Sequence, residues 1–382
     1  MDGLSSGRQG LPDAGHPRSA GEARMVRATP AVTAPVSTSS RVVGVQALRA
    51  VAALMVVAYH AIEQWTTHRP GYPPGEYWPN GSAGVDVFFV ISGLVMTLSV
   101  QRGALRPHPA YSFAKDRLIR IVPLYWIVTT VKIAAVVTLP ALAQRTRLDP
   151  LYVAGSYLLL PVHDATGVIR TVLPVGWTLT YEMFFYILVT VALLARIRLE
   201  AICLPALLAM ATAALVGPDS GFANTIVLEF LFGIAIARLM PRLQSQPPLL
   251  AATIGILGFA ALLAVPVGDG LLRPLTWGLP AACVVAAVVA LERALCRLTP
   301  RWLLEAGNAS YATYLTHGFV VPVVFLVCNR LISNDTIGLA IMVAAGLVAS
   351  AIAGQITHAV VETPLLLRLR TRRPVSTLPA AG

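Results

Sequence analysis

The chain has 382 residues, of which 56% are hydrophobic and only 12% are charged, and its mean hydropathy is +0.70. A soluble globular protein carries charge at roughly 25% of its positions, so this composition excludes an ordinary water-soluble protein and predicts a membrane protein. The net charge of +11 would suit nucleic acid, but the basic residues lie between apolar stretches, which favours a membrane.

The two ends of the chain differ from the rest. Residues 1–40 are rich in Gly, Pro, Ser, Ala and Arg, and we expect a disordered tail. This tail lacks the apolar core of a signal peptide, so we place it in the cytoplasm, with Met25 as an alternative start. Residues 41–364 form the expected transmembrane domain, and 365–382 form a basic cytoplasmic tail.

Apolar stretches of spanning length fill the region between the tails. They predict an all-α, polytopic bundle of about ten transmembrane helices at residues 44–62, 82–100, 119–140, 172–194, 201–216, 224–240, 248–266, 272–291, 309–330 and 336–359. The run 151–161 is too short to span, and we expect it to lie at the interface or to re-enter the membrane.

The positions of the basic residues predict the orientation. With the amino terminus inside, most of the 29 Lys and Arg residues fall in inner segments, and only Arg49 and Lys132 fall within helices. Both termini are therefore expected in the cytoplasm, and the protein in the plasma (inner) membrane.

The first predicted helix contains Arg49 and His60. Eleven residues separate them, so their directions differ by about 20° and they lie about 16 Å apart along the axis. We expect both to face one interior passage, with Arg49 near the inner leaflet and His60 near the outer one. The alternative is an arginine that reaches toward the inner surface and a histidine hydrogen-bonded in the core.

The second predicted helix begins GVDVFFVISG and brings Asp86 to about the depth of His60. A carboxylate beside an imidazole can fix its tautomer and help it act as a general base. Glu63, one turn beyond His60, is a rival for that role. Ser92 and Gly93 are interpreted as residues that allow close helix packing.

Arg117 and Arg120 are three residues apart, so they share a helix face at the expected cytoplasmic surface. The planar guanidinium donates two hydrogen bonds at once, which suits phosphate. Anchoring to the inner leaflet is the alternative interpretation.

Two later helices also carry ionisable groups. Glu182 lies near the middle of its predicted helix, where a carboxylate must be paired or protonated. Its neighbours in sequence include three aromatic residues, Trp177, Tyr181 and Tyr186. His317 lies within the 309–330 helix, preceded by Ser310, Tyr311 and Tyr314. Glu362 ends the last helix, where capping or an ion pair is expected.

Four cysteines (Cys203, Cys283, Cys296 and Cys328) lack CxxC spacing, so no disulfide or zinc framework and no metal are predicted.

Taken together, these motifs resemble the membrane-bound acyltransferase 3 family, in particular its exopolysaccharide-acetyltransferase (ExoZ-like) branch. The motifs that carry the resemblance run in family order from residue 46 to residue 364: QALRAVAALMVVAYH, GVDVFFVISG, RLIRIVPLYW, GWTLTYEMFFY, LEFLFG and SYATYLTH. The resemblance implies O-acylation of a carbohydrate, with acyl-CoA, usually acetyl-CoA, as the cytoplasmic donor.

The resemblance also implies residue roles. Arg49 and His60 match the arginine and histidine thought essential in the family, Arg117 and Arg120 match its CoA-associated basic pair, and Glu182 matches its helix-four acid. Many members have Trp-Ser-Leu-x-x-Glu where this chain has Trp-Thr-Leu-Thr-Tyr-Glu. That difference fits the ExoZ-like branch and leaves the acceptor open.

From these residues we expect His60, oriented by Asp86 or Glu63, to deprotonate a sugar hydroxyl while the CoA phosphates remain at the inner face. The acceptor contacts are expected to be Glu63, Trp177, Tyr181, Tyr314 and His317. Whether His60 carries the acyl group transiently stays open, with the base preferred. Two other functions stay open: an acyltransferase that acts on a small-molecule glycoside, and a saccharide transporter or flippase.

Overall fold

The computed structural model describes residues 42–69, 72, 77–104, 106–138, 148–164, 166–216, 222–268, 270 and 272–370. The tail expected at 1–40 and residues 371–382 of the expected basic tail lie outside this part of the chain. Residues 365–370 belong to the last helix.

The described residues are helical, apart from loops and one isolated bridge between His163 and Ile169, which confirms the all-α prediction. The helices in chain order are α1 (Val43–His68), η1 (Pro79–Ala83), α2 (Gly84–Gly103), α3 (Pro109–Thr138), α4 (Pro150–Tyr157), α5 (Gly176–Ala195), α6 (Leu199–Val216), η3 (Thr225–Val227), α7 (Leu228–Leu243), α8 (Pro248–Ala264), η4 (Pro274–Gly278), α9 (Leu279–Ala290), α10 (Glu292–Leu298), α11 (Arg301–Asn308), α12 (Ser310–Leu331), α13 (Asp335–Thr357), η5 (His358–Glu362) and α14 (Thr363–Arg370).

Each of the ten predicted helices coincides with a helix of the structure. The sequence pattern missed two short helices, α10 and α11, and placed the start of α3 too late, because its first turns are polar. The run 151–161 overlaps α4, which begins at Pro150 and ends at Tyr157.

Seven helices in the described part of the chain are long and apolar enough to cross a membrane: α1, η1 with α2, α3, α5, α6, α12, and α13 with η5 and α14. The segment Pro274–Ala290 with α10 makes an eighth if this pair, bent by 75°, is one span. Helices α7 and α8, of 16 and 17 residues, are shorter. The count of ten spans and the cytoplasmic termini therefore stay predictions.

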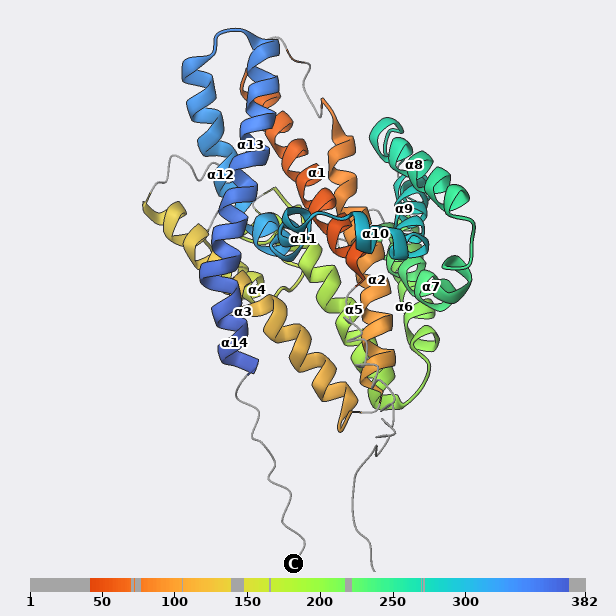
Figure 1. Ribbon diagram of the computed structural model, residues 1–382. Helices are drawn as coiled ribbons and strands as arrows, with labels where there is room; N and C mark the ends of the chain where they lie inside the picture. Colours follow the sequence, from red (N-terminus) through yellow and green to blue (C-terminus); the bar gives the residue numbers. More distant parts are fainter. Residues whose placement is uncertain are drawn as a thin grey trace, which may run out of the picture. The chain divides into compact units, whose positions relative to one another are not determined.

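Helix α1 packs against the N-terminal part of the bundle, through α2, and against the C-terminal part, through α11, α12 and α13. Figure 1 shows α12 and α13 side by side, with α13 continuing into α14. Because α1 contacts elements from both halves of the sequence, its polar residues can meet side chains some 250 residues away.

Helices α2 and α7 approach most closely at two glycines, as expected for Gly93. A Cβ atom on Gly93 would overlap the Phe230 carbonyl, and one on Gly233 would overlap the Val90 carbonyl. Small residues let membrane helices pack backbone against backbone, and this crossing brings α7 close to the polar residues of α2.

The outward faces of several helices are apolar, as a lipid environment requires. Exposed aliphatic residues include Leu249, Ile256 and Leu257 on α8, and Val323 and Val327 on α12. The polar and ionisable side chains described below lie inside the bundle instead.

Candidate active site

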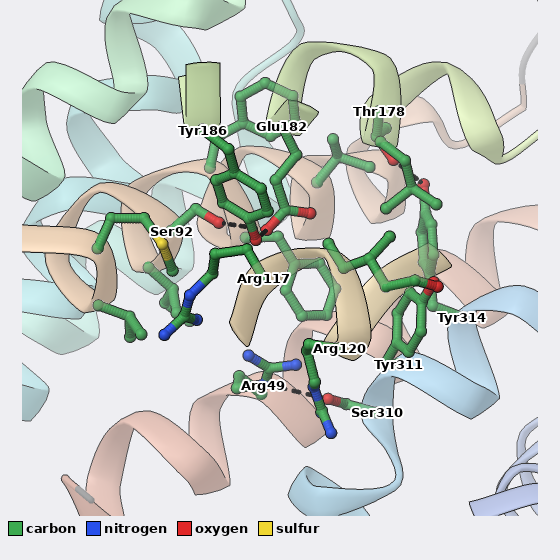
Figure 2. A pocket seen from close by; sticks show the side chains of 18 of the residues that line it. Arg49, Ser92, Arg117, Arg120, Thr178, Glu182, Tyr186, Ser310, Tyr311 and Tyr314 are labelled. Carbon is green, nitrogen blue, oxygen red and sulfur yellow. Dashed lines mark hydrogen bonds between the residues drawn. The ribbon is translucent and has the colours of Figure 1, made fainter. Parts of the chain in front are cut away.

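A narrow cavity of about 110 Å³ lies between α1, α2, α3, α5 and α12. We call it the arginine cavity, because Arg49, Arg117 and Arg120 line it. Figure 2 shows the three guanidinium groups near one another, with Glu182 and Tyr186 of α5 across from Arg49 and Arg120. Arg49 of α1 and the basic pair of α3 therefore line the same cavity.

Each arginine is held by a partner. Arg49 Nε donates to Ser310 Oγ at 3.2 Å, and Arg117 Nη2 donates to Ser99 Oγ at 3.1 Å. Arg120 Nη1 lies 2.7 Å from Oε1 of the buried Glu362. Since a serine hydroxyl brings no negative charge, the charges of the first two arginines remain available to an anion.

Glu362 has the ion-pair role expected of it. Its Oε2 lies 2.7 Å from His358 Nδ1, and both residues belong to η5, a π-helical turn between α13 and α14. A π-turn inserts an extra residue and redirects side chains, and such turns often accompany functional sites. Here the turn places a carboxylate under Arg120.

Glu182 lies in the wall of the arginine cavity and accepts two hydrogen bonds at Oε1. Ser92 Oγ donates at 2.9 Å and Tyr186 OH donates at 2.5 Å. Ser92 was interpreted as a packing residue, so its polar role was missed. In the sequence, Ser92 is a hydroxyl next to the helix-packing Gly93. Nothing in the sequence connects it to Glu182, which lies 90 positions later.

A larger cavity of about 680 Å³ lies beside the first, and we call it the histidine cavity because His60 and His317 line it. His60 Nδ1 lies 2.9 Å from Glu63 Oε2, and the His60 ring stacks on the His317 ring with centroids 5.1 Å apart. A carboxylate accepts hydrogen bonds only, so Nδ1 carries the proton and Nε2 of a neutral His60 is left as an acceptor.

Aromatic side chains form another part of this wall. Trp177 and Tyr181 of α5 and Tyr59 of α1 line the histidine cavity. Tyr181 is fixed by stacking on Phe222, with ring centroids 4.9 Å apart. Rigid aromatic faces with a few polar groups are typical of small-molecule sites.

The two cavities share wall residues, Val85 and Tyr314. The Tyr314 hydroxyl lies 3.0 Å from Thr178 Oγ1 and donates weakly to the Val175 carbonyl at 3.3 Å. The sequence predicted a single passage that joins Arg49 to His60. The structure instead has two adjacent cavities, one lined by Arg49 and one lined by His60, with Tyr314 and Val85 in the wall of both.

Asp86 differs from its prediction. It is fully buried, lines neither cavity, and forms a two-point ion pair with Arg273, at 3.2 Å to Nε and 3.0 Å to Nη2. The buried Glu229 lies against it. Glu63, the rival, is the carboxylate bonded to His60. The depth of Asp86 along its helix could be predicted from the sequence. Its partner could not, because Arg273 comes from a segment 187 residues away.

The loop before α5 adds Arg170 to the histidine cavity. Arg170 Nη1 lies 3.7 Å from Asp164 Oδ2, while Asp164 Oδ1 accepts hydrogen bonds from Thr166 and from the Val168 N–H. Burial opposes ionisation of Asp164, but these hydrogen bonds and Arg170 outweigh it and lower the pKa of its carboxyl. Asp164 therefore serves its own loop as an anion.

The residues predicted to contact the acceptor lie together in one cavity, and their roles stay predictions. Glu63, Trp177, Tyr181, Tyr314 and His317 all line the histidine cavity. Three basic residues without a predicted role also line it: Lys132, Arg170 and Arg273. In the described residues, no group of three or more metal-ligating side chains is found, and the absence of a metal stays a prediction.

The apolar helices and the buried ionisable groups define a multi-pass membrane protein with a polar interior. Residues 42–356 match the family described as an acyltransferase domain. The chain belongs to this acyltransferase family, which confirms the resemblance seen in the motifs.

Two relatives illustrate the match. The exopolysaccharide production protein ExoZ of Rhizobium meliloti is 33% identical over 316 residues, which cover 78% of this chain and 94% of that protein. The acyltransferase MdmB of Streptomyces mycarofaciens is 27% identical over 382 residues, which cover 87% of this chain and 93% of that protein. No solved structure gives a significant match.

Proposed function

We propose that the protein transfers an acyl group, acetyl in our expectation, from cytoplasmic acyl-CoA to a hydroxyl of an exopolysaccharide or its lipid-linked precursor in the plasma (inner) membrane. The observation that carries this proposal is the adjacency of the arginine cavity and the histidine cavity, which share Val85 and Tyr314. The family match supports the reaction class, and the similarity to ExoZ, named as an exopolysaccharide production protein, supports the acceptor.

The arginine cavity would bind the donor. Arg49, Arg117 and Arg120 offer guanidinium groups to the phosphates of CoA, and an arginine fork recognises phosphate by two hydrogen bonds at once. A volume of about 110 Å³ equals only a few water molecules, so the nucleotide would stay outside while the narrow pantetheine arm enters. The arm would then pass Tyr314 to bring the thioester to His60.

The histidine cavity would bind the acceptor. Its volume of about 680 Å³ lies in the range of small-molecule sites, and Trp177 and Tyr181 offer faces on which a sugar ring can stack. His317, stacked on His60, would limit the rotation of that ring.

The chemistry follows from the His60–Glu63 pair. Nε2 of His60 takes the proton of the sugar hydroxyl as its oxygen attacks the thioester carbonyl carbon. The new C–O bond forms, the C–S bond breaks, and the imidazolium returns the proton to the CoA thiolate. Glu63 holds the imidazole by Nδ1 and stabilises its charged form, as the carboxylate of a catalytic triad does.

The test is transfer of label from radiolabelled acetyl-CoA to surface or lipid-linked saccharide in membranes that contain the full chain. His60→Ala and Arg49→Ala should reduce transfer to background, because one removes the base and the other a donor contact. General-base help is worth about 10²–10⁴-fold.

His68→Ala provides the matched control, since His68 lies on the same helix and lines neither cavity. That variant should retain activity, and all three should insert to the same level. Full activity of His60→Ala would contradict the catalytic role. Transfer in detergent solution distinguishes an acyltransferase from a flippase, since transport needs two compartments.

A further inference from the structure

Lys132 of α3 lines the histidine cavity and has no assigned role in the reaction above. It is partly buried, and no carboxylate or hydrogen-bond acceptor among the described residues pairs with it. Its Nζ lies over the Phe319 ring, 5.9 Å from the ring centroid. A cation over a phenyl ring at that distance gains little.

An ammonium group within a membrane helix costs about 2.5–3.5 kcal/mol, so such groups usually have an anionic partner or mark a ligand path. A lysine near a helix end can instead extend its amine to the interface. Lys132 lies in the wall of a cavity, which favours a ligand as its missing partner.

The other charged groups of this cavity are already engaged. Arg273 is bound at two points by Asp86, and Glu63 is bound to His60. Arg170 lies 3.7 Å from Asp164, a carboxylate that its own loop already hydrogen-bonds. Lys132 is therefore the cation of the described wall that is left without a carboxylate partner.

We infer that the histidine cavity takes an acidic saccharide, whose anionic group, a carboxylate or a phosphate, binds Lys132. The inference rests on the proposed function, because it names the class of acceptor for the same cavity. An anion held by α3 would fix the position of the sugar relative to His60 of α1, and neutral sugars would lack that contact.

The test measures binding to the purified full chain in detergent, without an acyl donor. The probes are cellobiose, cellobiouronic acid and cellobiose 1-phosphate, which share one disaccharide and differ in charge. At least one anionic probe should bind about tenfold more tightly than cellobiose, as expected for one charge-assisted contact. Preference for the uronic acid identifies a carboxylate as the natural group, and preference for the phosphate identifies a phosphate.

Lys132→Gln should remove this preference, and Lys132→Arg should retain most of it. The chain has only two lysines, and Lys115, which lines neither cavity, gives the matched control Lys115→Gln with its preference intact. Equal binding of the three probes, no binding of any of them, or a preference that survives Lys132→Gln overturns the inference.

Acyl transfer measured separately distinguishes this inference from the proposed function. Lys132-dependent binding of an anionic probe without any transfer from acetyl-CoA to acidic acceptors would contradict the acyltransferase function and leave the acidic ligand in place. Equal transfer to neutral and acidic acceptors, in the wild type and in Lys132→Gln, would contradict the acidic ligand and leave the acyltransferase function in place.

Discussion

Three carboxylates near α1 and α2 show how residues of one type take different roles. Glu63 is partly exposed in the histidine cavity and lies 2.9 Å from His60. Asp86 is fully buried and bound to Arg273, and Glu229 lies buried against it. Only Glu63 has both access to a ligand cavity and contact with the proposed base, so it can act on the reaction while Asp86 serves the fold.

Glu63→Gln should lower acyl transfer while leaving the protein folded. The amide oxygen can still accept the hydrogen bond from Nδ1 of His60, but it cannot stabilise the charged imidazolium, so we expect a loss of about 10–100-fold. The rate of transfer from labelled acetyl-CoA and the unfolding temperature in detergent are measured together.

Glu305→Gln is the matched control for this change, because Glu305 is exposed on α11 and lines neither cavity. A Glu63→Gln enzyme as active as the Glu305→Gln enzyme would show that His60 needs no carboxylate partner.

At the level of helices, the crossing of α2 and α7 depends on glycine at position 93. A methyl group there would overlap the Phe230 carbonyl of α7 and force the helices apart. Gly93→Ala should therefore destabilise the protein by about 1–3 kcal/mol, the usual cost of overpacking. The measurement is the temperature of unfolding in detergent.

Gly103→Ala on the same helix is the control, because a Cβ atom at Gly103 meets no atom within 4 Å. That change should leave stability equal or slightly higher, since alanine favours a helix more than glycine does. Equal stability of the two variants would show that α2 and α7 tolerate a wider separation than the structure indicates.

The helices were predictable from sequence to a far greater extent than the site. Long apolar stretches identify a helix such as α5 directly, because lipid requires every backbone group to be paired within the segment. Short polar helices such as α10 and α11 carry no such signal and were missed. The pairing of Asp86 with Arg273 was missed because rotation of each helix is set by packing, which helical periodicity does not report.

Contacts between residues far apart in the sequence account for the other differences between the predicted site and the structure. The stacking of His60 on His317 and the hydrogen bond from Ser92 to Glu182 join separate helices, and the sequence placed them only by depth. Depth was sufficient to gather the proposed acceptor residues in one cavity. It was not sufficient to show that Arg49, Arg117 and Arg120 line a different cavity.

For the whole molecule, the orientation in the membrane can be tested with a native cysteine. Cys296 is exposed on α10, whereas Cys203 and Cys328 are buried. The predicted topology puts Cys296 on the cytoplasmic side. In a Cys283→Ser background, a membrane-impermeant maleimide should label inverted vesicles and leave right-side-out vesicles unlabelled.

Further substitution of Cys296 by serine in that background should remove the label altogether. Labelling of right-side-out vesicles would place α10 outside and reverse the predicted orientation, and with it the side from which the donor reaches the arginine cavity.

The Tyr314 side chain, which lines both cavities, has a consequence for the cell that makes this protein. An enzyme that binds a charged coenzyme from one side of the membrane and a sugar from the other needs a polar interior, and a continuous polar interior can leak protons and ions. Because Val85 and Tyr314 line both cavities, a file of water that joined the two cavities would have to pass these side chains. In the proposed reaction the pantetheine arm passes the same ring, which would preserve the electrochemical gradient between turnovers by closing behind it.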